Sequence, residues 1–92
     1  MSQSPEQRAI ELATIRQLIL QSAKSFPTGV TAQTLRITLG ASGYDLPAAE
    51  VADHLRYLQA DDMLTSREHP LSAGLVSYHP TAKALKSLER AG

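Results

Sequence analysis

The chain has 92 residues, of which 42% are hydrophobic and 4% aromatic. A chain of this length forms one small domain that buries roughly 60 to 65% of its unfolded surface. It contains no cysteine, which excludes disulfides, thiolate zinc sites and cysteine nucleophiles. Nine Lys and Arg balance nine Asp and Glu, so any binding to nucleic acid must depend on a local patch of charge.

The sequence has no pattern of a signal peptide or of a membrane span. Its first residues lack a basic region followed by an apolar core, and no apolar run is long enough to cross a bilayer. We therefore expect a soluble, cytoplasmic protein with no membrane partner.

The first helix is expected at residues 5–25. Ser4 can cap it, Pro5 suits the first helical position, and Gln7 completes a capping box. Apolar residues at helical spacing predict the face that packs on the core. These residues are Leu12, Ile15, Leu18, Ile19 and Ala23, with Phe26 closing the face before Pro27 stops the helix.

A minimal strand is expected at Val30, followed by a second helix at residues 31–39. Thr31 can cap this helix, and Gly40 is suited to the left-handed residue that ends it. Gly43 then allows the chain to reverse before the third helix. The buried face of the second helix is predicted to contain Ala32, Leu35 and Leu39.

The third helix is expected at residues 47–62. On a helical wheel of about 100 degrees per residue, Val51, Leu55 and Leu58 share the face that packs on the core. His54 lies at the edge of this face and is predicted to be half-buried. The residues predicted to face outward are Ala49, Asp53, Arg56, Tyr57 and Ala60.

Two short strands, at residues 63–68 and 75–79, predict a wing over residues 63–79. Pro80 keeps the preceding residue extended, and Thr81 can cap a last helix at residues 81–90. Helix, strand, helix, helix, strand, strand, helix is the order of a winged helix-turn-helix. The predicted fold is therefore a single, mainly α winged-helix domain over residues 1–92.

The segment from Val51 to Leu64 has a Val, polar residues, two spaced Leu and then a hydrophobic pair. It resembles the recognition helix of ArsR-type and MarR-type winged helices. Thr81 with Ala82-Lys83-Ala84 is similar to the Thr, two residues and Gly that follow their wing, and Asp62 stands where a Gly is expected. With Gly43-Tyr44 before the third helix, the chain also resembles the small ArsR-like winged-helix proteins of Mu-like phages.

This resemblance covers residues 15–91 and implies a DNA-binding transcriptional regulator of phage or prophage type. The residues expected to contact double-stranded DNA are Arg36, Ala49, Asp53, Arg56, Tyr57, Arg67 and His69. Arginine can pair with guanine or with phosphate, whereas the carboxylate of Asp53 opposes phosphate. Because Arg and Tyr among small residues also suit a protein partner, the alternative is a protein-interaction module, such as an adaptor or inhibitor of a host protein.

A homodimer is expected, since it would place two recognition helices about one DNA turn apart. The predicted dimer interface combines apolar residues that fall off the core face of the first helix with two on the last helix: Ile10, Ala13, Leu20, Leu85 and Leu88.

We predict no metal, no cofactor and no enzymatic activity. The three histidines, His54, His69 and His79, are spread over a helix and a hairpin without the spacing of metal ligands. Gly40 to Gly43 lacks the preceding strand and following helix of a nucleophile elbow.

Overall fold

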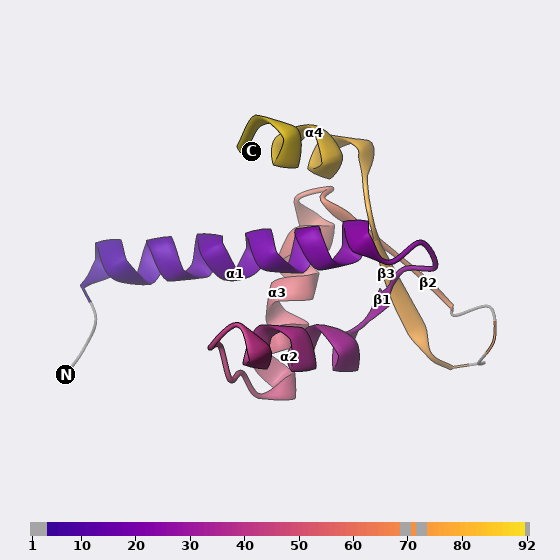
Figure 1. Ribbon diagram of the computed structural model, residues 1–92, viewed down its shortest axis with the longest axis horizontal. Coiled ribbons are helices and arrows are strands. Elements are labelled where there is room, and N and C mark those ends of the chain that lie inside the picture. Colours follow the sequence, from indigo (N-terminus) through magenta and orange to yellow (C-terminus); the bar gives the residue numbers. More distant parts are fainter. Residues whose placement is uncertain (1–3, 69–70, 72–73, 92) are drawn as a thin grey trace.

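The computed structural model describes residues 4–68, 71 and 74–91. Its longest element is the helix α1 (Pro5–Ser25), whose first turns project beyond the other elements in Figure 1. The predicted capping box is confirmed, because the Gln7 amide donates to the Ser4 hydroxyl at 3.2 Å and the Ser4 amide donates to Gln7 Oε1 at 3.3 Å. Phe26, predicted to close the core face, is instead 42% exposed beyond the end of the helix.

The helix-turn-helix consists of α2 (Ala32–Ala41) and α3 (Ala48–Ala60). The hydroxyl of Thr31 accepts from the Thr34 amide and caps α2, as predicted. The prediction for Gly40 is wrong, because this residue lies inside α2 and Gly43 has the left-handed conformation, at φ 95°. The amides of Gly43 and Tyr44 donate to the carbonyls of Gly40 and Leu39, which is the bonding of a Schellman motif.

The end of α3 repeats this motif with an aspartate in the left-handed position. Asp62 has φ 59°, and it occupies the place where the resemblance to ArsR-type and MarR-type winged helices predicts glycine. Its amide donates to the Gln59 carbonyl at 3.1 Å, and the Met63 amide donates to the Leu58 carbonyl at 2.8 Å. The chain therefore turns sharply from α3 into the wing.

The sheet is antiparallel, with β3 (Val76–Pro80) in the centre between β1 (Val30–Thr31) and β2 (Leu64–Glu68). The predicted first strand at Val30 is confirmed, and its residue pairs with Tyr78. The predicted second strand of the wing, 75–79, is displaced by one residue, because Pro80 is included and pairs with Leu64. A proline has no amide to donate, and here it lies at the end of the strand.

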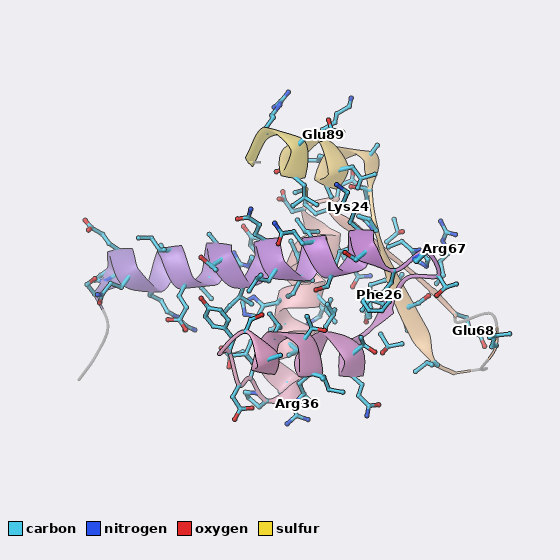
Figure 2. The ribbon with its side chains drawn as sticks, viewed as in Figure 1. Lys24, Phe26, Arg36, Arg67, Glu68 and Glu89 are labelled. Carbon is cyan, nitrogen blue, oxygen red and sulfur yellow. The ribbon has the colours of Figure 1, made fainter. Side chains whose placement is uncertain are left out.

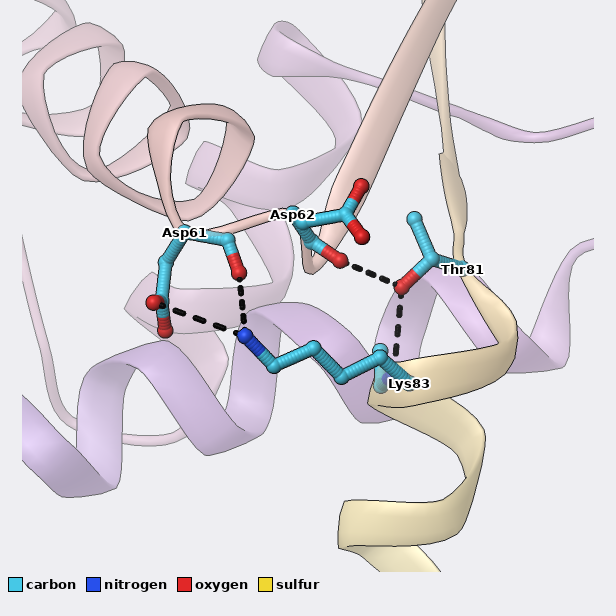
Figure 3. Close-up of polar contacts among 5 residues, drawn as sticks. Asp61, Asp62, Thr81 and Lys83 are labelled. Carbon is cyan, nitrogen blue, oxygen red and sulfur yellow. Dashed lines mark hydrogen bonds and ion pairs between the residues drawn. The ribbon is translucent and has the colours of Figure 1, made fainter.

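The last helix, α4 (Ala82–Ala91), lies on the opposite side of α1 from α2 (Figure 1). Its start is fixed to the end of α3, as Figure 3 shows. The Thr81 hydroxyl donates to the Asp62 carbonyl at 2.7 Å and accepts from the Ala84 amide at 3.1 Å, which confirms its predicted role as a cap. Lys83 Nζ donates to the Asp61 carbonyl at 2.9 Å and lies 3.6 Å from its carboxylate.

The core lies where α1, α2, α3 and the sheet meet. Three predictions about it are wrong: Leu20 is 5% exposed and belongs to the core, Ala32 is exposed, and His54 is 4% exposed rather than half-buried. Leu12 and Leu18 are only partly buried. The buried apolar residues are Ile15, Ile19, Leu20, Ala23, Val30, Leu35, Leu39, Val51, Leu55, Leu58, Leu64 and Ala84.

Over residues 4–68, 71 and 74–91, the architecture is a mainly helical winged helix with four helices and a three-stranded antiparallel sheet. Within the described ranges, no helix is long and apolar enough to cross a membrane.

Candidate nucleic-acid interface

One side of α3 is exposed along its length. We call this side the outward face and define it by four residues: Ala49, Asp53, Arg56 and Ala60. They recur at intervals of three and four residues, so they lie above one another on the helix. As predicted, all four are exposed, while Val51, Leu55 and Leu58 on the other side are buried.

The outward face carries no net charge. Its only ionisable residues, Asp53 and Arg56, form an ion pair in which the guanidinium Nη2 contacts the carboxylate Oδ1. Both side chains are about two-thirds exposed, at 68% and 70%, so the pair itself contributes little stability. The pair instead affects ligand binding, because a phosphate that approaches Arg56 must compete with the Asp53 carboxylate for the guanidinium.

Tyr57 lies apart from the outward face. The guanidinium carbon of Arg16 lies 3.5 Å from the centroid of its ring, in a cation–π contact between α1 and α3. Half of Tyr57 remains exposed, but one face of its ring is covered by α1. The structure therefore places Tyr57 beside α1, whereas the sequence groups it with Ala49, Asp53 and Arg56.

Tyr57 belongs to a row of three residues on α3 that we call the inner flank: Glu50, Tyr57 and Asp61. Each member contacts a cation from another helix. The Glu50 carboxylate lies 3.7 Å from Arg8 of α1, Tyr57 lies under Arg16, and Asp61 pairs with Lys83 of α4. These contacts hold α3 from its first turn to its end.

These contacts were not predicted, although the sequence contains a partial signal for them. The spacing of the inner flank, seven and then four residues, is that of one side of a helix. The partners could not be predicted, because Arg8, Arg16 and Lys83 come from helices whose crossing depends on the tertiary fold.

Arg36 lies in the middle of α2, and its side chain reaches the loop before α3. Its Nε donates to the Leu46 carbonyl at 3.0 Å, so its guanidinium is held against this loop while the side chain stays exposed. Figure 2 shows Arg36 and Arg67 on well-separated parts of the surface. The fold therefore does not collect the predicted arginines into one cluster.

Arg67 projects from β2 on the side of the sheet away from α3. The neighbouring Ser66 hydroxyl accepts from Gln59 of α3 at 3.1 Å, and successive residues of a strand point to opposite faces. Arg67 pairs in register with the buried Ser77. The next residue, Glu68, accepts from the Gly74 amide at 3.1 Å, while the predicted contact residue His69 lies outside the described residues.

His79 shares that face of the sheet with Arg67. Its Nε2 lies 3.2 Å from the Ser77 hydroxyl, and burial, followed by the charge of Arg67, lowers the pKa of His79. Gly29 fits against the imidazole, because a Cβ at this position would lie 2.5 Å from Nε2. The wing is thus fixed to the turn that follows α1.

The candidate interface therefore has separated components: the outward face of α3, Arg36 beside the loop that precedes it, and Arg67 on the wing. In the part of the chain that the structure describes, no three His, Asp or Glu side chains are grouped so that they could hold a metal ion.

No protein-family model matches this chain, and no curated protein matches it. Its fold is similar to solved structures of ZitR from Lactococcus lactis. A variant of ZitR with one cysteine replaced by serine matches 99% of this chain at a TM-score of 0.73 and 19% sequence identity. A second variant in the apo form, with a cysteine and a histidine replaced by alanine, matches 94% at a TM-score of 0.70 and 18% identity. The chain spans 55 to 60% of the length of these ZitR chains, and the likeness establishes the winged-helix fold.

Proposed function

We propose that this protein is a DNA-binding transcriptional regulator that contacts duplex DNA through α3 and the wing. The observation that carries the proposal is the contrast between the two sides of α3. The inner flank is held by Arg8, Arg16 and Lys83, while the outward face is left exposed. A helix that is fixed on one side and exposed on the other has the form required to enter a major groove.

The charges support binding of modest affinity. Arg36, Arg56 and Arg67 are exposed and could contact phosphates or base edges. However, Asp53 already pairs with Arg56, and the three cations lie on different elements. Each phosphate contact adds to the affinity and to its dependence on salt. With few such contacts, we expect weak binding whose affinity falls only slowly as the salt concentration rises.

The structural neighbours support the same function at a coarse level, since they are transcriptional regulators. The phage-type and cytoplasmic assignments are part of the proposal. The first rests on the resemblance around Gly43-Tyr44, where Gly43 supplies the left-handed turn before α3.

The second candidate function is a protein-interaction module that binds no DNA. It is favoured by the ion pair between Asp53 and Arg56, which leaves the outward face neutral. Small residues at Ala49 and Ala60 around this pair would let a partner surface approach closely. A face whose one positive and one negative charge cancel suits a protein partner better than a polyanion.

Binding to a random-sequence DNA duplex, measured by fluorescence anisotropy across a salt series, separates the two functions. A regulator should bind with a Kd below about 10 micromolar at about 50 mM salt, and Arg56→Ala should weaken binding by roughly 1 to 3 kcal/mol. Arg90→Ala is the matched control, because it removes the same charge from α4, away from the outward face. A wild-type protein without measurable affinity at this salt concentration would establish the interaction module instead.

We also propose a homodimer formed through α1 and α4. The exposed residues available for it are Ile10, Ala13 and Leu85, with Leu88 partly buried at their edge. Leu20 is removed from the predicted interface, because it already packs inside the domain. A groove between α1, the end of α3 and α4 is lined by Ala13, Tyr57, Met63 and Leu88 among others, and a partner chain could pack there.

A further inference from the structure

His54 is the one histidine of the described residues that is buried in the domain. It lies on α3 between the packed face and the inner flank, and charges of α1 act on its ring. Its imidazole is 4% exposed, and neither ring nitrogen has a hydrogen-bond partner among the described residues. Burying a polar group without a partner is unfavourable, so a role in packing alone would be better served by an apolar side chain.

The charges around His54 come from both helices. From α1, the charges of Arg16 and Arg8 both act on the ring, and Glu11 is half-buried on the same helix. From α3 itself, Glu50 and Asp53 act on the ring. Glu50 lies against Arg8 and Asp53 against Arg56, so both carboxylates already have cationic partners.

The arginine that acts more strongly on the ring, Arg16, is itself partly buried. Arg16 stacks on Tyr57, and its Nε is buried without a hydrogen-bond partner. Burial first, and the charge of Arg16 second, lower the pKa of His54 below its ordinary value. The imidazole is therefore neutral at neutral pH, and it gains a charge only when the pH falls.

We propose that His54 makes the junction of α1 with α3 sensitive to acid: uptake of a proton from solvent adds a third cation to the buried junction that already holds the charges of Arg8 and Arg16, and α1 separates from α3. The neutral ring allows the two helices to pack. The charged ring repels both arginines and requires water, which it can reach only if α1 moves away. Since α1 holds Glu50 and Tyr57 of the inner flank, mild acid would loosen the helix that carries the outward face.

The sign of the pH dependence follows from linkage. In the unfolded chain His54 binds a proton near its ordinary pKa of about 6.5, whereas in the folded protein it binds the proton at a lower pH. The unfolded state therefore holds more protons between these two values. The contribution of neutral His54 to stability is complete above the unfolded pKa, and it is lost as the pH falls from about 6.5 toward the folded pKa.

The test compares thermal unfolding of the wild-type protein and His54→Leu at pH values of about 7.5 and 5. The wild-type melting temperature should fall by at least about 4 °C more than that of His54→Leu. His79→Asn is the control, because His79 also has a lowered pKa but lies on the sheet, and this variant should keep the excess loss. Equal losses in the wild-type protein and His54→Leu would overturn the proposal.

Two measurements on the wild-type protein keep the proposal testable if His54→Leu does not fold. With three histidines in the chain, NMR can follow each imidazole, and the resonance of His54 should titrate at a lower pH than that of a model peptide. Hydrogen exchange at about pH 5 should increase in α1 before it increases in α2 and β3. An ordinary titration of His54, or uniform exchange across the helices, would refute the mechanism. Neither measurement involves DNA, so a failure here is distinct from a failure of the proposed function.

Discussion

At the scale of single residues, Asp62 is the clearest departure from what local chemistry prefers. It holds φ 59° at the corner between α3 and β2, a conformation that favours glycine. Its carboxylate also lies at the end of a helix, where a negative charge is unfavourable. What it contributes to the fold is its backbone, whose carbonyl accepts from Thr81 and whose amide donates to Gln59.

Replacing Asp62 by glycine should therefore stabilise the protein. Asp62→Gly removes the strain and the charge but keeps both backbone hydrogen bonds, so we expect the free energy of unfolding to rise by about 0.5 to 1 kcal/mol in urea denaturation. Asp61→Gly is the matched control. Asp61 has an ordinary φ of −88° and pairs with Lys83, so its replacement should destabilise. A loss of stability in Asp62→Gly would show that its side chain has a role not accounted for above.

How far single residues can be predicted from the sequence depends on the range of their interactions. The caps at Ser4, Thr31 and Thr81 are confirmed, because each hydroxyl bonds to an amide three residues away. The positions of Leu20 and Tyr57 could not be predicted. Leu20 is buried beside Leu88 of α4, and the ring of Tyr57 stacks under the guanidinium of Arg16. Helical periodicity identifies a face, but the direction from which other helices arrive is set by the tertiary fold.

At the scale of elements, α1 has two halves with different surroundings. Its second half packs in the core through Ile15, Ile19 and Ala23. Its first half projects past the other helices and leaves Ile10 exposed, at 67% (Figure 1). Ala13 and Leu20 line the groove beside α4, whereas Ile10 lines a neighbouring groove with Gly43 and Tyr44.

The exposure of Ile10 on the projecting half of α1 predicts the effect of a charge there. If the proposed dimer uses this surface, Ile10→Glu should give monomers in light scattering, because a carboxylate would be buried in the interface without a partner. Ile37→Glu provides a matched control, since Ile37 on α2 has the same exposure of 67% and lies outside the proposed interface. A monomeric wild-type protein, or equal effects of the two substitutions, would exclude this interface.

At the scale of the whole molecule, charge is balanced and spread rather than gathered. The chain has no net charge, and the carboxylates of α3 lie against cations from three helices: Glu50 against Arg8, Asp53 against Arg56, and Asp61 against Lys83. Two of these pairs fix α3 in the fold, but the pair of Asp53 and Arg56 joins no other element. If the outward face contacts DNA, as we propose, Asp53 is the residue that limits its attraction to phosphate.

The central claim, that DNA approaches the outward face of α3, is tested most directly by removing one negative charge in two different places. Asp53→Asn releases Arg56 on the outward face, whereas Glu89→Gln makes the same change in net charge on α4 (Figure 2). In anisotropy titrations with one duplex at about 50 mM salt, we predict that Asp53→Asn binds about 2- to 10-fold more tightly than the wild-type protein and that Glu89→Gln is unchanged. Equal gains in the two variants, or no gain in Asp53→Asn, would contradict the claim.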